Sequence, residues 1–187
     1  RSAGIRPSAA VLVATIRAIK FHGGAAREDL REENVPALRA GLANLNRHIN
    51  NLRENYGVPA VVSINQFVAD TDAEVELVME HCKALGVQVA LSSHWANGGA
   101  GATDLAHMVA EICDADTTPA NTPHNSFVYP GELSLWEKLE AVATKVYHAS
   151  EITASSKVRD RLKELTDGGY GHPVSYTHLT LPTIAEV

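Results

Sequence analysis

The sequence is poor in the residue patterns that define most catalytic and metal-binding motifs. It has only two cysteines among 187 residues, too far apart for a CxxC pair, so reduced thiols fit better than a disulfide framework. Nine histidines are present, but none belongs to an HExxH pair, which disfavours a metal site. The sequence also contains no GxSxG elbow and no GxxxxGKS/T phosphate loop. Serine-hydrolase chemistry and self-sufficient nucleotide hydrolysis therefore have no support.

Excess positive charge and long apolar runs are also lacking. The formal net charge is −6 and the pI is about 5.8, which speaks against nucleic-acid binding and a general membrane-surface role. No apolar run approaches the roughly 20 residues that a spanning helix needs. We therefore expect a cytoplasmic protein that acts on small molecules. Because the chain begins with Arg1 rather than Met, we also expect it to be part of a longer protein.

What the sequence does have is an alternation of apolar runs and helical periodicity, which predicts an α/β fold. Between the runs Pro59–Asn65 and Val87–Ser92, apolar residues recur at helical spacing, and strand, helix, strand is the βαβ unit with parallel strands. The run Ala9–Ile16 is typical of a strand buried on both faces. Helices are predicted at 35–52, 71–85, 103–113, 134–146 and 155–165.

These patterns divide the chain into three parts. Residues 1–115 are expected to form a parallel sheet with flanking helices. Residues 116–174 begin with a segment rich in Pro, Thr and Asn and continue with a small helical unit. The tail at 175–187 shows neither helical period nor strand alternation. The α/β part is therefore the expected location of any ligand site.

Two large aromatic residues mark the carboxyl ends of neighbouring strands. Phe67 follows the second predicted strand and Trp95 follows the third, and ligands of open α/β sheets bind at this edge. The glycine-rich loop Asn97–Gly101 comes directly after Trp95. Together these residues predict a slot for a flat ring, with Asn65 and Asp70 placed to hold its polar edges. From the residues alone, core packing of the aromatics and loop capping by Asp70 remain open.

A second group of polar residues follows the first predicted strand. Arg17, Lys20 and His22 come just before Gly23 and Gly24, at the same expected edge of the sheet. Arg17 and Lys20 are candidates for contact with an anion there. The competing interpretation is that both are solvated cations of a loop.

Four blocks of the sequence occur together in an order that identifies a family. The blocks VATIRAIKFHGG, PAVVSINQFVADTDAE, SHWANGGAGATDLA and GYGHPV closely resemble formate–tetrahydrofolate ligase, from Arg1 to about Val174. The resemblance implies an ATP-dependent ligation in which ATP phosphorylates formate to formyl phosphate. The N10 amine of tetrahydrofolate then attacks the formyl carbon, giving 10-formyltetrahydrofolate, ADP and phosphate.

The resemblance also implies roles for particular residues. Phe67 and Trp95 stand where the family sandwiches the folate ring. Val68 stands where the family often has Pro, so this loop is expected to be less rigid here. The same pocket would be lined by Asn65, Gln66, Val68, Gly98 and Gly99, with Arg17, Lys20 and His22 as weaker candidates.

The resemblance places the ATP half of the site outside this chain. ATP and tetrahydrofolate are the implied substrates, and a monovalent cation and a homo-oligomer of the intact enzyme are left open. The implied sheet is P-loop NTPase-like but incomplete, with its cut edge exposed. We assign no catalytic residue within the chain and expect the chain alone to be inactive. Two alternatives stay open: a non-catalytic fragment that does not bind folate, and a partner-binding α/β module.

Overall fold

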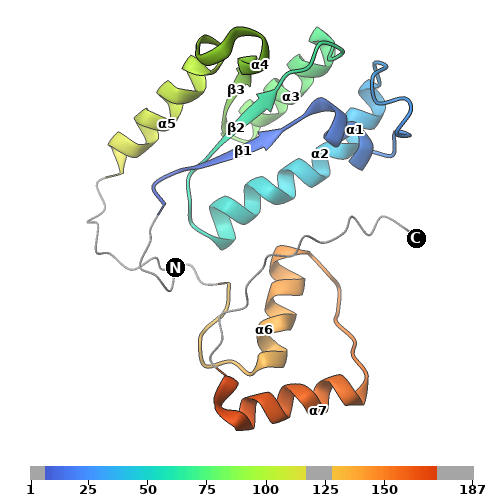
Figure 1. The fold of residues 1–187 in the computed structure, drawn as a ribbon, viewed down its shortest axis with the longest axis vertical. Helices are drawn as coiled ribbons and strands as arrows, with labels where there is room; N and C mark the ends of the chain where they lie inside the picture. Colours follow the sequence, from blue (N-terminus) through green and yellow to red (C-terminus); the bar gives the residue numbers. More distant parts are fainter. Residues whose placement is uncertain (1–6, 117–127, 172–187) are drawn as a thin grey trace. The chain divides into compact units, whose positions relative to one another are not determined.

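The computed structural model describes residues 7–116 and 128–171, which belong to two compact units (Figure 1). The first unit contains residues 7–116 and the second contains residues 128–171. The first unit carries the sheet and all the residues predicted to bind a ligand.

The first unit is built on a three-stranded parallel sheet. Its strands are β1 (Ala10–Ala14), β2 (Ala60–Asn65) and β3 (Gln88–Ser92), in the order β1-β2-β3. Central position explains why β2 is buried along nearly its whole length, whereas β1 and β3 are edges. The predicted α/β fold with a parallel sheet and flanking helices is confirmed.

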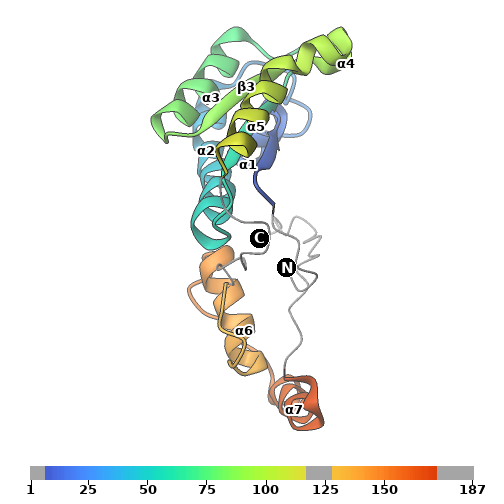
Figure 2. The same ribbon diagram turned by 90° about the vertical axis from the view of Figure 1, so that its left-hand side faces the viewer.

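Helices cover the sheet on both faces. Figure 2 shows the sheet between α5 on one side and α2 and α3 on the other, in agreement with the contacts of these elements. The helices of this unit are α1 (Ile16–His22), α2 (Val35–Asn50), α3 (Asp72–Ala84), α4 (His94–Asn97) and α5 (Thr103–Ala115). A π-helical turn, η1 (Asn51–Asn55), continues α2, and a 3-10 turn, η2 (Gly98–Ala102), joins α4 to α5.

The prediction of a strand over Ala9–Ile16 is wrong at its carboxyl end. The chain turns at Thr15, whose Oγ1 accepts the Ala18 N–H at 3.1 Å and so caps α1. Arg17, Lys20 and His22 consequently lie on a helix rather than on a strand-end loop.

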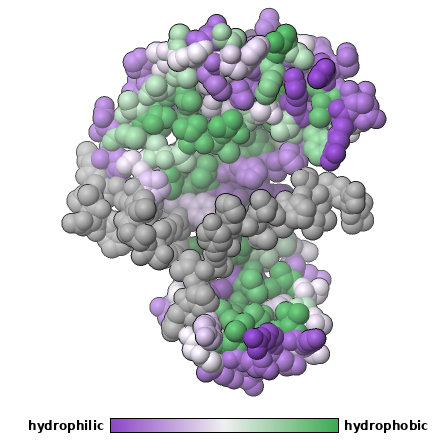
Figure 3. Space-filling view, in the orientation of Figure 1, coloured by the Kyte–Doolittle hydropathy of each residue, from purple (hydrophilic) through white to green (hydrophobic). Residues whose placement is uncertain are grey.

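Burial of the first strand on both faces was also a wrong prediction. Val11 and Val13 are 42% and 62% exposed, because α5 packs on β2 and β3 and leaves this part of the sheet uncovered among the described residues. Figure 3 shows apolar surface on this side of the unit, over β1 and α5.

The core lies between the other face of the sheet and helices α1 to α3, and it is aliphatic. Glycines let α1 and α2 approach closely, since a Cβ at Gly41 would overlap the Ile19 carbonyl and one at Gly23 would overlap the Ala37 carbonyl. The core is formed by Ala14, Ile16, Ile19, Leu38, Leu42, Leu45, Ile49, Val62, Ile64, Val75, Val78, Cys82, Val87 and Val89.

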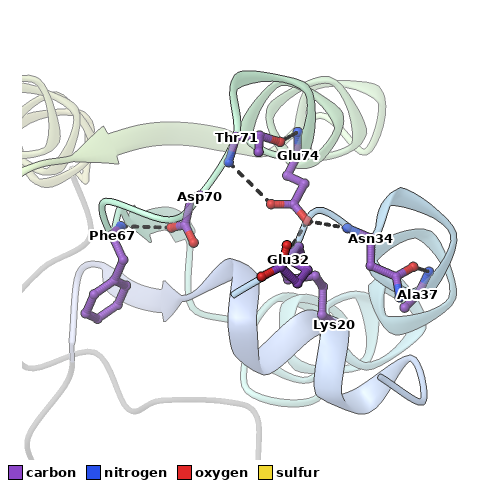
Figure 4. A network of polar contacts seen from close by, with 8 residues as sticks. All are labelled: Lys20, Glu32, Asn34, Ala37, Phe67, Asp70, Thr71 and Glu74. Carbon is purple, nitrogen blue, oxygen red and sulfur yellow. Dashed lines mark hydrogen bonds and ion pairs between the residues drawn. The ribbon is translucent and has the colours of Figure 1, made fainter. Parts of the chain in front are cut away.

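A buried ion pair crosses this core. Lys20 Nζ of α1 lies 2.9 Å from Glu74 Oε1 of α3, and both side chains are fully buried (Figure 4). Lys20 also donates to the Glu32 carbonyl at 2.7 Å, and Glu74 accepts the backbone N–H groups of Asn34 at 2.9 Å and Thr71 at 3.3 Å. These bonds satisfy both charges where water cannot reach them.

The same bonds set the ionisation of Glu74. Burial by itself raises the pKa of this carboxyl, but the bond from Lys20 and the two backbone N–H bonds outweigh burial and hold the pKa below its ordinary value of 4.5. The ionised pair is therefore the form that the fold stabilises.

The second unit consists of short helices. They are α6 (Leu135–Ala141) and α7 (Ser156–Leu165), each continued by a wider turn, η3 (Val142–Val146) and η4 (Thr166–Tyr170). A capping box of Ser134 and Glu137 begins α6. Arg159 of α7 lies over the Trp136 ring of α6 at 4.3 Å, and buried Lys138 donates to the Gly171 carbonyl at 2.7 Å. Across 7–116 and 128–171, every helix is too short or too polar to cross a membrane.

The buried pair predicts a large cost when one partner is removed. Lys20→Met leaves Glu74 as a buried charge without its partner, so we expect the unfolding free energy to fall by about 3–5 kcal/mol. Urea denaturation followed by circular dichroism measures this loss. Lys83→Met, at an exposed position of α3, is the matched control and should cost no more than about 0.5 kcal/mol. Equal losses in the two variants would contradict the assignment.

The lowered pKa of Glu74 predicts how stability depends on pH. The pair contributes fully above the ordinary value of 4.5, and its contribution is lost as pH falls through the lower pKa of the folded state. The difference in unfolding free energy between the wild type and Glu74→Gln should therefore shrink as pH drops below 4.5. Denaturation curves at a series of pH values test this, and a difference that stays constant down to pH of about 3 would refute it.

Candidate functional site

The carboxyl ends of β2 and β3 lie side by side. The predicted aromatics lie in the two segments that follow these strands. Asn65 pairs with Ser92 in the parallel register, and the Gln66 N–H donates to the Ser92 carbonyl at 3.0 Å just beyond the strands. Buried hydroxyls of Ser63 and Ser92 join the same strands 2.8 Å apart. The two segments therefore start from a fixed common edge.

The loop after β2 is closed by Asp70. Its carboxylate accepts the Phe67 N–H at 2.8 Å, and its own N–H donates to the Phe67 carbonyl at 3.0 Å (Figure 4). Thr71 then caps α3 in a capping box with Glu74. The Phe67 backbone is thus held from both sides, while Val68 at the loop tip is 83% exposed. The result is a half-buried Phe67 ring on a tied loop.

Arg17 of α1 lies against the Phe67 ring. Its guanidinium carbon is 4.5 Å from the ring centroid, a cation–π contact. The buried Nε of Arg17 has no hydrogen-bond partner, so the ring rather than a hydrogen bond through Nε holds this part of the guanidinium. One face of the Phe67 ring is therefore occupied by a cation, and only the other face is left for a ligand.

Trp95 lies on the short helix α4, which follows β3, and reaches back to the loop of Phe67. Its indole Nε1–H donates to the Gln66 carbonyl at 2.7 Å, one residue before Phe67. The side chain is nevertheless 55% exposed. This bond brings the two predicted aromatics to one edge of the sheet and leaves much of the indole open to a ligand.

The glycine-rich segment after Trp95 folds back on the end of β3. The Ser93 N–H donates to the Gly101 carbonyl at 3.0 Å, and a Cβ at Gly101 would lie 2.6 Å from the Ser93 carbonyl carbon. Gly98 has φ 57° and ψ −144°, a conformation that favours glycine. Gly98 and Gly99 are exposed beside Trp95. Residues without a Cβ are therefore required where the loop turns.

The remaining predicted site residues have separate positions. Asn65, at the end of β2, has a buried Oδ1 without a hydrogen-bond partner. Lys20 lies in the core, paired with Glu74, and is left out of the proposed site. His22 is exposed at the end of α1. The structure thus groups Asn65, Gln66 and the two aromatics, and it adds Arg17 through Phe67.

Asp70 has an unusual ionisation. Burial raises the pKa of its carboxyl above the ordinary value. The Phe67 N–H bond and the Arg17 charge lower the pKa, but they offset only part of this rise. Two roles for Asp70 were open from the sequence, holding a polar edge of a ligand and capping its loop, and the structure shows the loop cap. Arg17 was placed among the anion contacts. The three-residue spacing of Phe67 and Asp70 is a local signal for this turn. No local signal exists for the contact of Arg17 with Phe67, because the two residues are far apart in the chain.

Other sites in the described parts of the chain are less developed. Residues 7–116 and 128–171 contain no group of three His, Cys, Asp or Glu side chains able to hold a metal ion. The second unit has a cavity of about 310 Å³ next to Trp136, Arg159 and Lys163. Its polar groups are largely committed already, since Arg159 stacks on Trp136 and Thr166 donates to the Leu162 carbonyl. None of the predicted site residues lines it.

Aromatic side chains in the segments that follow two neighbouring strands, at the carboxyl edge of a parallel sheet, define a class: an open α/β protein whose candidate ligand site lies at its strand ends. The sequence model of the family "Formate--tetrahydrofolate ligase" matches residues 1–181, past Val174 where we expected the resemblance to stop. The chain belongs to the formate–tetrahydrofolate ligase family.

Individual relatives agree with this assignment. The chain is 52% identical over 172 residues to a formate–tetrahydrofolate ligase of Methylococcus capsulatus, covering 92% of this chain and 30% of that protein. It is 50% identical over 175 residues to a protein of the same name from Granulibacter bethesdensis, covering 92% of this chain and 29% of that protein. The chain therefore spans just under a third of the length of these curated relatives.

The close approach at Gly101 predicts that an alanine there displaces the loop of Trp95. Gly101→Ala should lower the unfolding free energy by about 1–3 kcal/mol, because the new Cβ overlaps the Ser93 carbonyl group. It should also change acrylamide quenching of Trp95, read in a Trp136→Phe background. A Cβ at Gly99 meets no atom within 4 Å, so Gly99→Ala is the matched control. Unchanged stability and quenching in Gly101→Ala would contradict the geometry.

Proposed function

We propose that the strand-end site binds the folate ring of tetrahydrofolate between Phe67 and Trp95. The whole protein then joins formate to tetrahydrofolate at the expense of ATP, by way of formyl phosphate. N10 attacks the formyl carbon and gives up its proton, the carbon–oxygen bond to phosphate breaks, and phosphate leaves with the electron pair of that bond. This chain supplies the folate half of the site, and its relatives carry the name of that reaction.

The observation that carries the proposal is the 2.7 Å bond from the Trp95 indole to the Gln66 carbonyl. Without it, an exposed Trp95 would be free to turn into solvent and would have no defined relation to Phe67. With it, the two rings belong to one edge and their positions are set by the same pair of strands. Rings that are already held at one edge lose less conformational freedom on binding than free side chains would.

The location of the aromatics favours ligand contact over core packing. The core of this unit is aliphatic, whereas the Phe67 ring is half-buried and Trp95 is 55% exposed. Burial of the apolar surface of an aromatic side chain is favourable in free energy relative to its exposure to water. A ring stacked on it contributes about 0.5–1.5 kcal/mol per contact beyond the effect of the buried area. The exposed indole surface is thus available for stacking.

Asn65 provides a polar group at the same edge. Its buried Oδ1 lacks a hydrogen-bond partner, which costs about 1–3 kcal/mol for such a group. A small shift of this side chain toward an N–H of the ligand would remove that cost. Gln66, Val68, Gly98 and Gly99 complete the proposed lining through the two loops, with Arg17 acting from behind Phe67.

The ATP half of the reaction is assigned to the rest of the protein. The sequence has no GxxxxGKS/T loop, and the chain spans about 30% of its relatives. We therefore place ATP binding mainly on residues outside the 187 and regard the sheet as part of a P-loop NTPase-like fold. Use of a monovalent cation, assembly into a homo-oligomer and a cytoplasmic location belong to the same proposal for the whole enzyme.

The proposal predicts saturable binding of tetrahydrofolate by this chain. In a Trp136→Phe background, tetrahydrofolate should quench the emission of Trp95 with a saturable dependence on concentration. Phe67→Leu should raise the dissociation constant by about three- to tenfold, because one stacking contact is lost. The measurement is a fluorescence titration under anaerobic conditions, with free tryptophan titrated in parallel to correct for absorption by the ligand.

Two controls separate binding from loss of structure. Trp95→Ala with Trp136 intact should show no saturable change beyond the absorption correction, and far-ultraviolet circular dichroism must show that each variant is folded. A folded chain whose Trp95 emission does not respond to tetrahydrofolate would refute binding by this half-site and favour the non-catalytic alternative.

A further inference from the structure

Arg17 occupies a position that the proposed sandwich of two aromatics does not explain. Its guanidinium carbon lies 4.5 Å from the centroid of the Phe67 ring. A ligand that stacks on that ring must therefore use the opposite face. Its buried Nε–H has no hydrogen-bond partner. A guanidinium gives up hydrogen bonding to water at this nitrogen, so the contact with the ring is the interaction that the structure retains in its place.

The position of this cation is fixed by the fold on both sides. Thr15 caps α1 and sets the first helical turn, on which Arg17 lies. Lys20, one turn later, anchors α1 to Glu74 of α3. Asp70 holds the backbone of Phe67 through two hydrogen bonds. The Arg17 guanidinium and the Phe67 ring are therefore held in contact by helix α1 on one side and by the closed loop of Phe67 on the other.

A cation on one face of an aromatic ring changes what the other face prefers. The π cloud of Phe67 is drawn toward the positive charge, so the opposite face becomes less negative. A less negative face attracts an electron-rich ring more strongly than an electron-poor ring. In a tetrahydropterin, the saturated ring nitrogens donate electrons into the pyrimidine ring, whereas the fully oxidised pterin is an electron-poor pair of fused azines.

We infer that Arg17 is a specificity-determining residue that makes the Phe67 ring select the reduced, tetrahydro form of folate over the oxidised form. This inference rests on the proposed function, because it takes folate as the ligand of the Phe67 edge. Arg17 acts through Phe67 and is not itself a catalytic residue. Its effect is therefore expected in the ratio of two affinities and not only in their magnitude.

The test compares the affinities of the 187-residue chain for tetrahydrofolate and for folic acid by isothermal titration calorimetry under anaerobic conditions. In Arg17→Gln, the preference for tetrahydrofolate over folic acid, expressed as the ratio of the two dissociation constants, should fall by about two- to fivefold. This is the change expected from the loss of one cation–π contact at an exposed or half-buried position. Arg17→Lys keeps the positive charge and should retain a larger part of the wild-type ratio.

The chain offers a matched control for this substitution. Arg27 lies over the Phe21 ring at 5.5 Å, a second arginine–phenylalanine contact in the same unit. Arg27→Gln removes a cation from a phenylalanine outside the site and should leave the ratio unchanged. In a Phe67→Leu background, Arg17→Gln should no longer alter the ratio, because the ring that transmits the effect is gone.

The outcomes separate the inference from the function on which it rests. A purely structural role for Arg17 would weaken both ligands by the same factor, and an unchanged ratio in folded Arg17→Gln would overturn the inference while leaving folate binding in place. If Arg17→Gln does not fold, Phe67→Leu alone must lose the preference for the reduced ligand, and retention of the preference would overturn the inference. Failure of the wild type to bind either ligand would overturn the proposed function and the inference together.

Discussion

The buried ion pair of Lys20 and Glu74 determines where the candidate site can form. It joins α1, which carries Arg17, to α3, which begins just after the loop of Phe67. Both charges are removed from water, and each is compensated by further bonds, from Lys20 to the Glu32 carbonyl and from two backbone N–H groups to Glu74. A misplacement of either helix would leave an uncompensated buried charge. The fold thus enforces the distance between the Arg17 cation and the Phe67 ring.

Trp95 is positioned by a different device. It lies on α4, a short exposed helix without buried residues, and no buried charge anchors that helix in the described part of the chain. Its place follows from one indole hydrogen bond to Gln66 and from the tight turn at Gly101. A ring held by one hydrogen bond on a short exposed helix adjusts more readily than a ring on a loop that is closed by two hydrogen bonds. Phe67 therefore provides the rigid side of the proposed sandwich, and Trp95 provides the adaptable side.

The grouping of residues at the strand ends could be predicted from the sequence, but the contacts that hold these residues in place could not. Parallel strands bring their carboxyl ends to one edge, so Phe67 and Trp95 could be grouped from the order of the elements alone. Helix α1 was missed because the apolar residues continue across Thr15 into Ile16 without a change of pattern. Thr15 does cap the helix, but no Glu or Gln follows at the position that completes a capping box, so the usual signal was incomplete.

Contacts between distant segments could not be predicted in the same way. Arg17 with Phe67, and Lys20 with Glu74, join residues on different elements, and neither pair has a spacing rule. Lys20 is the clearer example. Charged side chains usually lie on the surface, and only the pairing with Glu74 in three dimensions compensates the free-energy cost of burying this one. Three residues apart on one helix, Arg17 and Lys20 have opposite surroundings: Lys20 meets a carboxylate in the core, and Arg17 meets an aromatic ring at the sheet edge. One short helix therefore serves both the stability of the fold and the proposed ligand site.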